Sequence, residues 1–426
     1  MRRHIVSRGL AWQLAACTLS PSAILASEVP LGDHAALALA DTADGVAMLD
    51  KPWHLTVEGS AGAVTERGES TVAAARGALD VSLDQRVTRA LRLVVRDRID
   101  DFSQGNANGY HTINTWKEGY LAWQPWPQAM LDLGRVNVRQ GVATGYNPTD
   151  WFREGAIRAV SSVSPESLRQ NRQGSVIARG QWLWEDVTVF ALFSPDLGGT
   201  SGQAPFSPDL ASTNGRNRYL TGISAALTER IQTQLLLQGG AGQSLQAGLN
   251  LSVLATDAVT AYLEWSGGQD RSQLNKALPI PPDTAFRQRL SAGGTWTLDS
   301  RISATLEFQY NSAAPDESQW DQFWTLPPQA RMRYNQYLAN AQELATRSGA
   351  FLFLNWRDAL MPRVDLSAIA RLDLVDRSSM QWLELRYRQS RWDIALQWQN
   401  NAGPQASTYG SLPRRQSLML LADRYF

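Results

Sequence analysis

Apolar and polar residues alternate with a period of two along most of the chain. In 244–253 (SLQAGLNLSV), Leu245 and Leu249 share one side with other apolar residues, and polar residues occupy the opposite side. The segments 301–311 and 392–399 repeat this arrangement. A period of two is typical of β-strands that bury one face, so the pattern predicts an all-β protein.

The alternation predicts about eighteen antiparallel strands. Many of them are about 9–11 residues long, which is the length that crosses a bilayer at a tilt. Their polar sides carry Glu, Arg, Asp and Gln, which suit a wet interior, while the apolar sides suit lipid. The predicted strands are 53–60, 78–87, 90–99, 114–124, 129–138, 172–184, 186–194, 217–228, 231–239, 244–255, 258–267, 287–298, 301–311, 349–357, 364–374, 380–389, 392–400 and 416–426.

The links between these strands alternate between short and long. Short links occur, for example, at 88–89, 229–230 and 256–257. This rhythm predicts a transmembrane up-and-down β-barrel with short periplasmic turns, long outer loops and both ends in the periplasm. The predicted long links are 61–77, 100–113, 139–171, 195–216, 268–286, 312–348 and 401–415.

Sixteen tryptophans are many for a chain of 426 residues. Amphipathic rings gather at the two membrane interfaces of outer-membrane barrels, and here aromatic residues gather near strand ends. The predicted girdle residues are Trp123, Trp126, Trp182, Trp184, Trp265, Trp296, Tyr310, Trp356, Trp382, Trp392 and Trp398.

The composition excludes several classes of protein. The 40 basic and 40 acidic residues balance, so the bulk charge indicates no nucleic acid or other polyanion as partner. A single cysteine excludes an internal disulfide framework. Past the N-terminus no run of about 18 apolar residues occurs, which excludes a helical membrane protein. The sequence shows no metal-ligand cluster and no phosphate-binding loop, so neither a metal nor a cofactor is expected.

The N-terminus has the pattern of an export signal. Three arginines precede an apolar stretch at 10–19, and cleavage is expected near Ala26. An alternative is lipidation, because LAAC, ending at Cys17, matches a lipobox. The expected organisation is a signal peptide at 1–26, a periplasmic leader at 27–52 and the barrel at 53–426.

The last predicted strand, QSLMLLADRYF, ends at Phe426. Here the chain resembles the Gram-negative outer-membrane β-barrels, and it is porin-like in strand number. The resemblance implies that Phe426 is an assembly signal for the barrel-assembly machinery, although Arg424 departs from the usual pattern. It also implies residence in the cell outer membrane, in contact with lipid and lipopolysaccharide. The oligomeric state is left open.

The link 139–171 contains the unusual stretch GVATGYNPTDWFRE at 141–154. General porins, which the chain resembles in architecture only, fold the loop after the fifth strand into the barrel. Gly141, Gly145 and Pro148 allow the bends that such a fold needs. We therefore expect this link to enter the lumen and narrow it. The expected anchoring residues are Tyr146, Asn147, Pro148, Trp151 and Phe152.

Arginines and carboxylates opposed at a constriction would orient polar solutes. The expected selectivity residues are Arg135, Arg139, Asp150, Arg153, Glu154 and Arg158, with Arg169, Arg172 and Glu166 nearby. The alternative is that NPTD is a simple turn and that these charges form structural salt bridges.

The longest link, 312–348, has helical spacing in its second half, after Pro327 and Pro328. Its aromatic residues Trp320, Phe323 and Trp324 could stack on sugar rings at the mouth of the barrel. The alternative is a lid helix that these aromatics pack onto the rim.

Charges on the polar sides of the strands predict a mixed lumen lining: Arg92, Arg96, Arg371, Arg386 and Arg388 against Asp80, Asp84, Glu264, Glu307, Asp373 and Asp393. The predicted function is a porin-like channel for passive diffusion of small polar solutes. Alternatives are an exporter of a secreted polysaccharide or other polymer, and an assembly or adhesion barrel with a blocked lumen. An enzyme is not expected, because His111, in a predicted outer loop, lacks catalytic spacing to a Ser or Asp.

Overall fold

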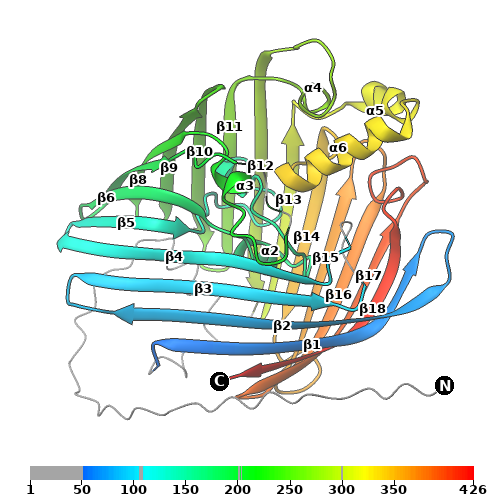
Figure 1. Cartoon of the computed structure of the whole chain (residues 1–426), viewed down its shortest axis with the longest axis horizontal. Helices are drawn as coiled ribbons and strands as arrows, with labels where there is room; N and C mark the ends of the chain where they lie inside the picture. Colours follow the sequence, from blue (N-terminus) through cyan, green and yellow to red (C-terminus); the bar gives the residue numbers. More distant parts are fainter. Residues whose placement is uncertain (1–50, 105–108, 200–201, 203, 299–300) are drawn as a thin grey trace, which may run out of the picture. The chain divides into compact units, whose positions relative to one another are not determined.

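The computed structural model describes residues 51–104, 109–199, 202, 204–298 and 301–426. Eighteen antiparallel strands form a closed ring, in which each strand pairs with its neighbours in sequence and β1 pairs with β18 (Figure 1). The strands are β1 (Trp53–Glu66), β2 (Thr71–Arg86), β3 (Leu91–Phe102), β4 (Thr112–Trp126), β5 (Ala129–Val136), β6 (Ser175–Leu183), β7 (Val187–Ser194), β8 (Arg218–Thr228), β9 (Ile231–Gly240), β10 (Gln243–Thr256), β11 (Val259–Asp270), β12 (Ala285–Leu298), β13 (Ile302–Asn311), β14 (Ser348–Trp356), β15 (Val364–Asp373), β16 (Ser379–Arg388), β17 (Trp392–Ala402) and β18 (Arg414–Tyr425). The predicted up-and-down barrel is confirmed. The predicted signal peptide, and the leader up to residue 50, lie outside the described residues.

The alternation of the sequence sorts side chains between the two faces of the ring. On β13, Leu306 is 64% exposed, whereas its neighbour Glu307 is 1% exposed. The apolar side of each strand therefore points outward, and the polar side points into the barrel. This sorting fixes the register, because a slip of one residue would turn every apolar side chain inward.

One predicted link is wrong. The range 61–77 was expected to be a long loop, but β1 and β2 continue through it and leave only 67–70 as the link. The stretch is rich in Gly and Ala, so it lacks the large apolar side chains that mark alternation. Pairing on both sides nevertheless satisfies its backbone, since Ala61 pairs with Leu420 of β18 and with Ala75 of β2.

Aromatic residues gather on the outward face at the end of the barrel that carries the short turns. Trp126, Trp182 and Trp184 are exposed there. The ring centroid of Trp182 lies 6.4 Å from that of Trp126 and 6.1 Å from that of Trp184. Trp382 was wrongly expected in this girdle. It points inward and packs with Phe351, because it lies on the inner side of β16.

Short helices occupy four of the long links. They are α2 (Pro165–Gln170), α3 (Leu210–Asn214), α4 (Gln273–Ala277), α5 (Glu317–Trp324) and α6 (Pro328–Ala341), with a 3-10 turn η2 at Trp151–Arg153. The predicted helix after Pro327 is therefore present as α6, and α5 and α6 lie at the end of the barrel that carries the long loops (Figure 1). Among the described residues, no helix is long and apolar enough to cross a membrane.

Candidate pore constriction

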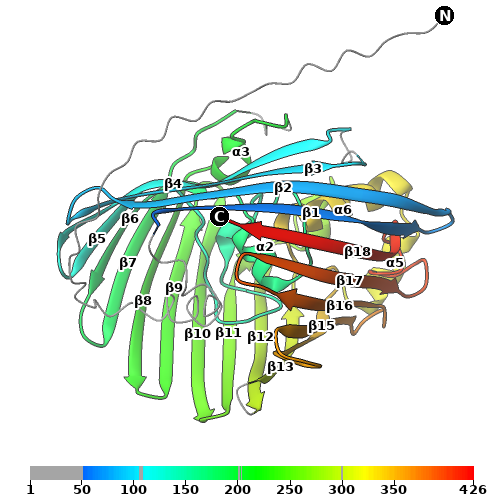
Figure 2. The same cartoon turned by 90° about the horizontal axis from the view of Figure 1, so that it is seen from below.

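The link between β5 and β6, residues 137–174, enters the barrel; we call it the inserted segment. Its α2 lies within the ring of strands in Figure 2. Two inward carboxylates, Glu264 of β11 and Glu307 of β13, accept hydrogen bonds from backbone N–H groups of the segment at 2.8–3.1 Å. The segment therefore enters the lumen, as we expected from the bends that its glycines and Pro148 allow.

The inserted segment packs against opposite walls. Phe152 and Trp151 pack on an apolar cluster contributed by β5–β9, which includes Leu220 and Leu236. Val163 packs on a second cluster contributed by β14–β16. Because β5 and β14 are nine places apart in a ring of eighteen strands, the segment spans the lumen. Apolar side chains on the inner wall thus mark where the segment rests.

The other expected anchoring residues also contact their surroundings. The Tyr146 hydroxyl donates to Glu343 at 2.5 Å, and the Asn147 side chain donates to Glu264 at 3.2 Å. The carbonyl oxygen of Pro148 accepts a hydrogen bond from Ser266 of β11 at 2.9 Å.

Four of the expected selectivity residues are held in structural contacts. Asp150 pairs with Arg172 at 2.8 Å, and Arg153 pairs with Glu343 at 2.8 Å. Glu154 pairs with Arg216 at 2.5 Å. Arg158 donates to the backbone carbonyl groups of Ser207, Gly202 and Ala204 in the link between β7 and β8. For these residues the geometry fits the alternative of structural salt bridges and hydrogen bonds.

Arg135 was expected at the constriction, but the structure places it on the outer side of the wall. It lies two residues after the exposed Leu133 of β5, so it shares the outward face. Its guanidinium lies 5.3 Å from the ring of Trp116 and donates to the carbonyl oxygens of Gly174 and Pro208. The sequence contained this signal, because the period of two in the predicted strand 129–138 puts Arg135 on the same side as Leu131 and Leu133.

Arg139 and Arg169 differ from the other arginines of the segment. Within the described part of the chain, neither guanidinium forms a hydrogen bond or an ion pair. Burial lowers the pKa of Arg139, and the positive charge of Arg169 lowers it further. Arg96 of β3 is also close; its side chain is 40% exposed and lies 3.2 Å from Glu118. These three arginines form a basic cluster where α2 approaches β3 and β4.

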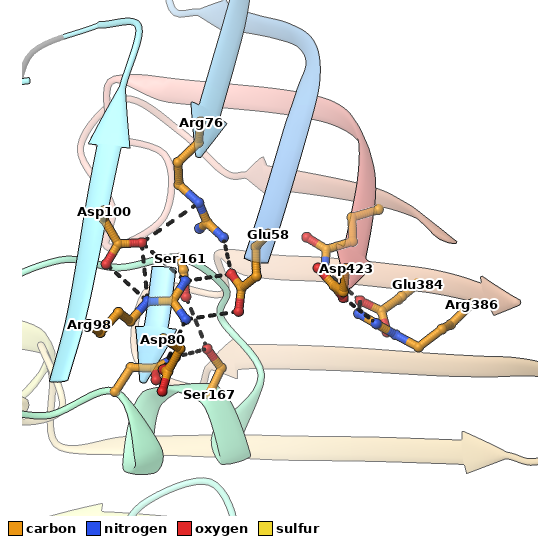
Figure 3. A network of polar contacts seen from close by, with 12 residues as sticks. Glu58, Arg76, Asp80, Arg98, Asp100, Ser161, Ser167, Glu384, Arg386 and Asp423 are labelled. Carbon is orange, nitrogen blue, oxygen red and sulfur yellow. Dashed lines mark hydrogen bonds and ion pairs between the residues drawn. The ribbon is translucent and has the colours of Figure 1, made fainter. Parts of the chain in front are cut away.

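Next to this cluster, the inner wall of β1–β4 carries a balanced charge network (Figure 3). Arg98 pairs with Glu58 at 2.5 Å, with Asp100 at 3.0 Å and with Asp80 at 3.4 Å. Lys117 connects Asp80 to Asn171 at the end of α2. Arg76 also belongs to the network, because it pairs with Glu58. The network therefore has three acidic and three basic side chains: Glu58, Asp80, Asp100, Arg76, Arg98 and Lys117.

The wall beyond the β1–β18 seam is acidic. Glu384, Asp393 and Asp423 all pair with the single guanidinium of Arg386, at 2.9, 3.4 and 2.7 Å. The inner surface therefore carries extra positive charge where Arg139 and Arg169 of the inserted segment lie beside β3 and β4, a balanced network on β1–β4, and three carboxylates around one guanidinium on β16–β18.

Exposure shows which part of the lumen the segment leaves accessible. The side chains of Glu58, Asp80 and Arg386 remain 22%, 19% and 23% exposed. Glu264 and Glu307, on the wall that the segment covers, are buried. Solvent therefore reaches the inner wall along β16–β18 and β1–β4. The sequence had singled out part of the charged lining there, namely Arg92, Arg96, Arg386, Arg388, Asp80, Asp84 and Asp393, but not Glu58, Arg76, Arg98, Asp100, Lys117, Glu384 and Asp423.

The mouth aromatics Trp320 and Phe323 are buried against each other, with stacked rings 4.8 Å apart. Tyr334 of α6 completes their cluster. Trp324 is only partly buried, and Arg331 lies 5.5 Å from its ring. The faces of Trp320 and Phe323 are thus not free to stack on a sugar, and the packing fits the alternative of a lid.

No protein-family model matches the chain, and no curated protein matches its sequence. Solved structures do match. OccAB1 from Acinetobacter baumannii aligns with a TM-score of 0.56 over 88% of this chain and 96% of that one, at 9% identity. A BenF-like porin from Pseudomonas fluorescens Pf-5 gives 0.53 over 89% and 99%, at 10% identity. OccK5 (OpdH) from Pseudomonas aeruginosa gives 0.50 over 88% and 98%, at 12% identity.

At these identities the likeness is one of fold. A closed ring of eighteen antiparallel strands with a segment inserted in the lumen is the architecture of a porin, and the chain has the fold of the porins of the Gram-negative outer membrane.

Proposed function

We propose that the protein is an outer-membrane channel through which small polar solutes diffuse passively. The observation that carries the proposal is the set of partly exposed charged side chains along β16–β18 and β1–β4, on the part of the inner wall that the inserted segment leaves uncovered. Rings and clusters of charged side chains give pores their ion selectivity. The porin fold supports the same function.

The basic cluster of Arg96, Arg139 and Arg169 suggests a preference for anionic solutes. Arg139 and Arg169 have no carboxylate partner among the described residues, so their charge acts on whatever enters the passage. A low-dielectric wall focuses such a field and raises the local concentration of the opposite charge. The acidic wall at β16–β18 would then orient a solute that carries both signs.

The proposal includes the cellular context expected from the sequence: export by a signal peptide, insertion by the barrel-assembly machinery, and contact with outer-membrane lipid and lipopolysaccharide. The outward apolar face of the ring supports a lipid environment.

A polymer exporter fits the geometry less well. A polymer chain needs a clear lumen, whereas the inserted segment spans this one between two apolar clusters. Arg153 also connects the segment to Glu343, next to the lid helix α6. Export would require both sets of contacts to break.

Single-channel recording in planar bilayers tests the proposal. We expect discrete conductance steps and a preference for anions over cations. In Arg139→Gln/Arg169→Gln, the anion-to-cation permeability ratio should fall at least about threefold, because two positive charges that form no ion pair are removed. Arg230→Gln, at an exposed site in the short turn between β8 and β9, is the matched control and should keep the wild-type ratio.

Absence of conductance steps from correctly folded protein would overturn the channel function. Conductance with an unchanged permeability ratio in the double variant would overturn only the role of the two arginines.

A further inference from the structure

Two carboxylates of the inner wall accept hydrogen bonds from backbone N–H groups of the inserted segment, and not from cationic side chains. We infer that Glu264 and Glu307 are positioning residues of the constriction: they hold residues 142–149 at a fixed place in the lumen and so set the width of the passage. The anchoring itself does not depend on the proposed channel function; only its effect on conductance rests on that function.

Glu264 is enclosed by the segment. Its carboxylate accepts hydrogen bonds from the backbone N–H groups of Val142, Ala143 and Thr149, at 2.9, 3.0 and 2.8 Å. The Thr149 hydroxyl and the Asn147 amide also donate to it, at 2.8 and 3.2 Å. Glu264 is fully buried at 0% exposure, and all of these donors come from the segment.

Glu307 is held in the same way, two strands further along the ring. It accepts from the backbone N–H groups of Thr144, Gly145 and Tyr146, at 2.9, 3.1 and 2.9 Å. Tyr262 and Gln309 of the wall donate to the same two oxygens, at 2.8 and 2.7 Å. The two carboxylates therefore share six backbone donors from the stretch 142–149.

Such an arrangement depends on both partners. A buried carboxylate needs several hydrogen bonds to remain in place, and buried backbone N–H groups need acceptors. Within the described residues neither carboxylate forms an ion pair, so the segment itself stabilises the charge. A glutamine could not replace either glutamate, because its amide nitrogen is a donor and would face further donors.

Two glycines allow the close approach. Gly141 has a φ of +95°, and a Cβ there would lie 2.4 Å from the carboxylate oxygens of Glu264. A Cβ at Gly145 would lie 2.6 Å from the ring of Phe351. The backbone can therefore lie close to Glu264 and to the wall. A segment held by apolar contacts alone would not need so close an approach.

Hydrogen exchange tests the inference without any measurement of transport. In Glu264→Gln and Glu307→Gln, exchange of the amides in 142–149 should accelerate about ten- to hundredfold, because their charged acceptor is lost. The barrel should still form, as judged by heat-modifiable migration in gels. Asp373→Asn is the matched control: Asp373 accepts backbone N–H groups of Val375 and Asp376, outside the segment, and its replacement should leave 142–149 unchanged.

Conductance then links position to function. Each glutamine variant should show a changed and noisier single-channel conductance. Glu264→Asp keeps a carboxylate at the site and should recover part of the wild-type conductance, whereas Glu264→Gln should not.

Unchanged exchange in 142–149 in both glutamine variants would overturn the inference. Faster exchange across the whole barrel, or a conductance of Glu264→Asp no closer to the wild-type value than that of Glu264→Gln, would show a general structural role and overturn it as well. If the folded wild type does not conduct, the exchange measurement still decides the inference, and only the proposed channel function fails.

Discussion

At the scale of single residues, the buried pair of Asp150 and Arg172 connects the beginning of the inserted segment's η2 turn to its last residues before β6. Both side chains are 2% exposed, and their atoms lie 2.8 Å apart. Burial lowers the pKa of Arg172, and the charge of Asp150 partly offsets this effect. The pair is costly to bury, but it is costlier to break, because one charge would then remain without a partner.

We expect Asp150→Asn to destabilise the folded protein by about 3–5 kcal/mol, because Arg172 would remain buried without a counter-charge. The measurement is the shift in the temperature at which heat-modifiable migration is lost. The double variant Asp150→Asn/Arg172→Met should recover most of the loss. A double variant as unstable as the single one would show that the pair is not the cause.

At the scale of elements, the lid formed by α5 and α6 is connected to the constriction through Glu343. This carboxylate, just after α6, accepts from Tyr146 and pairs with Arg153 of the segment and with Arg289 of β12. Burial raises the pKa of Glu343, but the two guanidinium groups outweigh burial, so the net shift is downward from 4.5. The ionised form therefore stabilises the closed lid.

The sign of this shift predicts a pH dependence. Stabilisation by Glu343 is fully present above its ordinary pKa of 4.5 and is lost as pH falls through the lowered value. We expect single-channel noise to increase on acidification below that range. Glu343→Gln should show the same noise already at neutral pH, with trypsin cleavage after Arg333 of α6 at least about tenfold faster. Glu317→Gln, at an exposed site on α5, is the control and should behave as wild type. A Glu343→Gln channel as quiet and protease-resistant as wild type would contradict the role of the lid contact.

At the scale of the whole molecule, the ring is a cylinder whose outward apolar side is matched to a bilayer. Leu306 lies in the middle of β13, and Leu298 lies at the end of β12 near the short turns. Charged side chains are costly on the lipid face near the midplane and cheap near the interfaces.

Leu306→Arg should therefore make folding into lipid vesicles less favourable by about 2–4 kcal/mol, whereas Leu298→Arg should cost only about 0–1 kcal/mol. Urea titration of vesicle-inserted protein measures both values. Equal costs at the two sites would show that β13 does not face the bilayer centre.

The sequence determined the ring of strands. A period of two sorts Leu306 outward and Glu307 inward whatever the rest of the chain does, so strand positions and topology followed from local pattern. The prediction was wrong where the local signal is weak, as in the Gly- and Ala-rich range 61–77, where only pairing with β18 and β2 shows that the strands continue. It was also wrong for Arg135, which follows Leu131 and Leu133 at a spacing of two and therefore shares their outward side.

Only the tertiary structure decided which charges face the passage. The residues around the NPTD turn are charged, but Asp150, Arg153 and Glu154 find partners at Arg172, Glu343 and Arg216, far away in sequence. Ion pairs between residues distant in sequence leave no local pattern in the sequence, because only the folded chain brings the two side chains together. The lack of an ion pair at Arg139 and Arg169 among the described residues, and the anchoring role inferred for Glu264 and Glu307, therefore depend on how the segment folds against the wall.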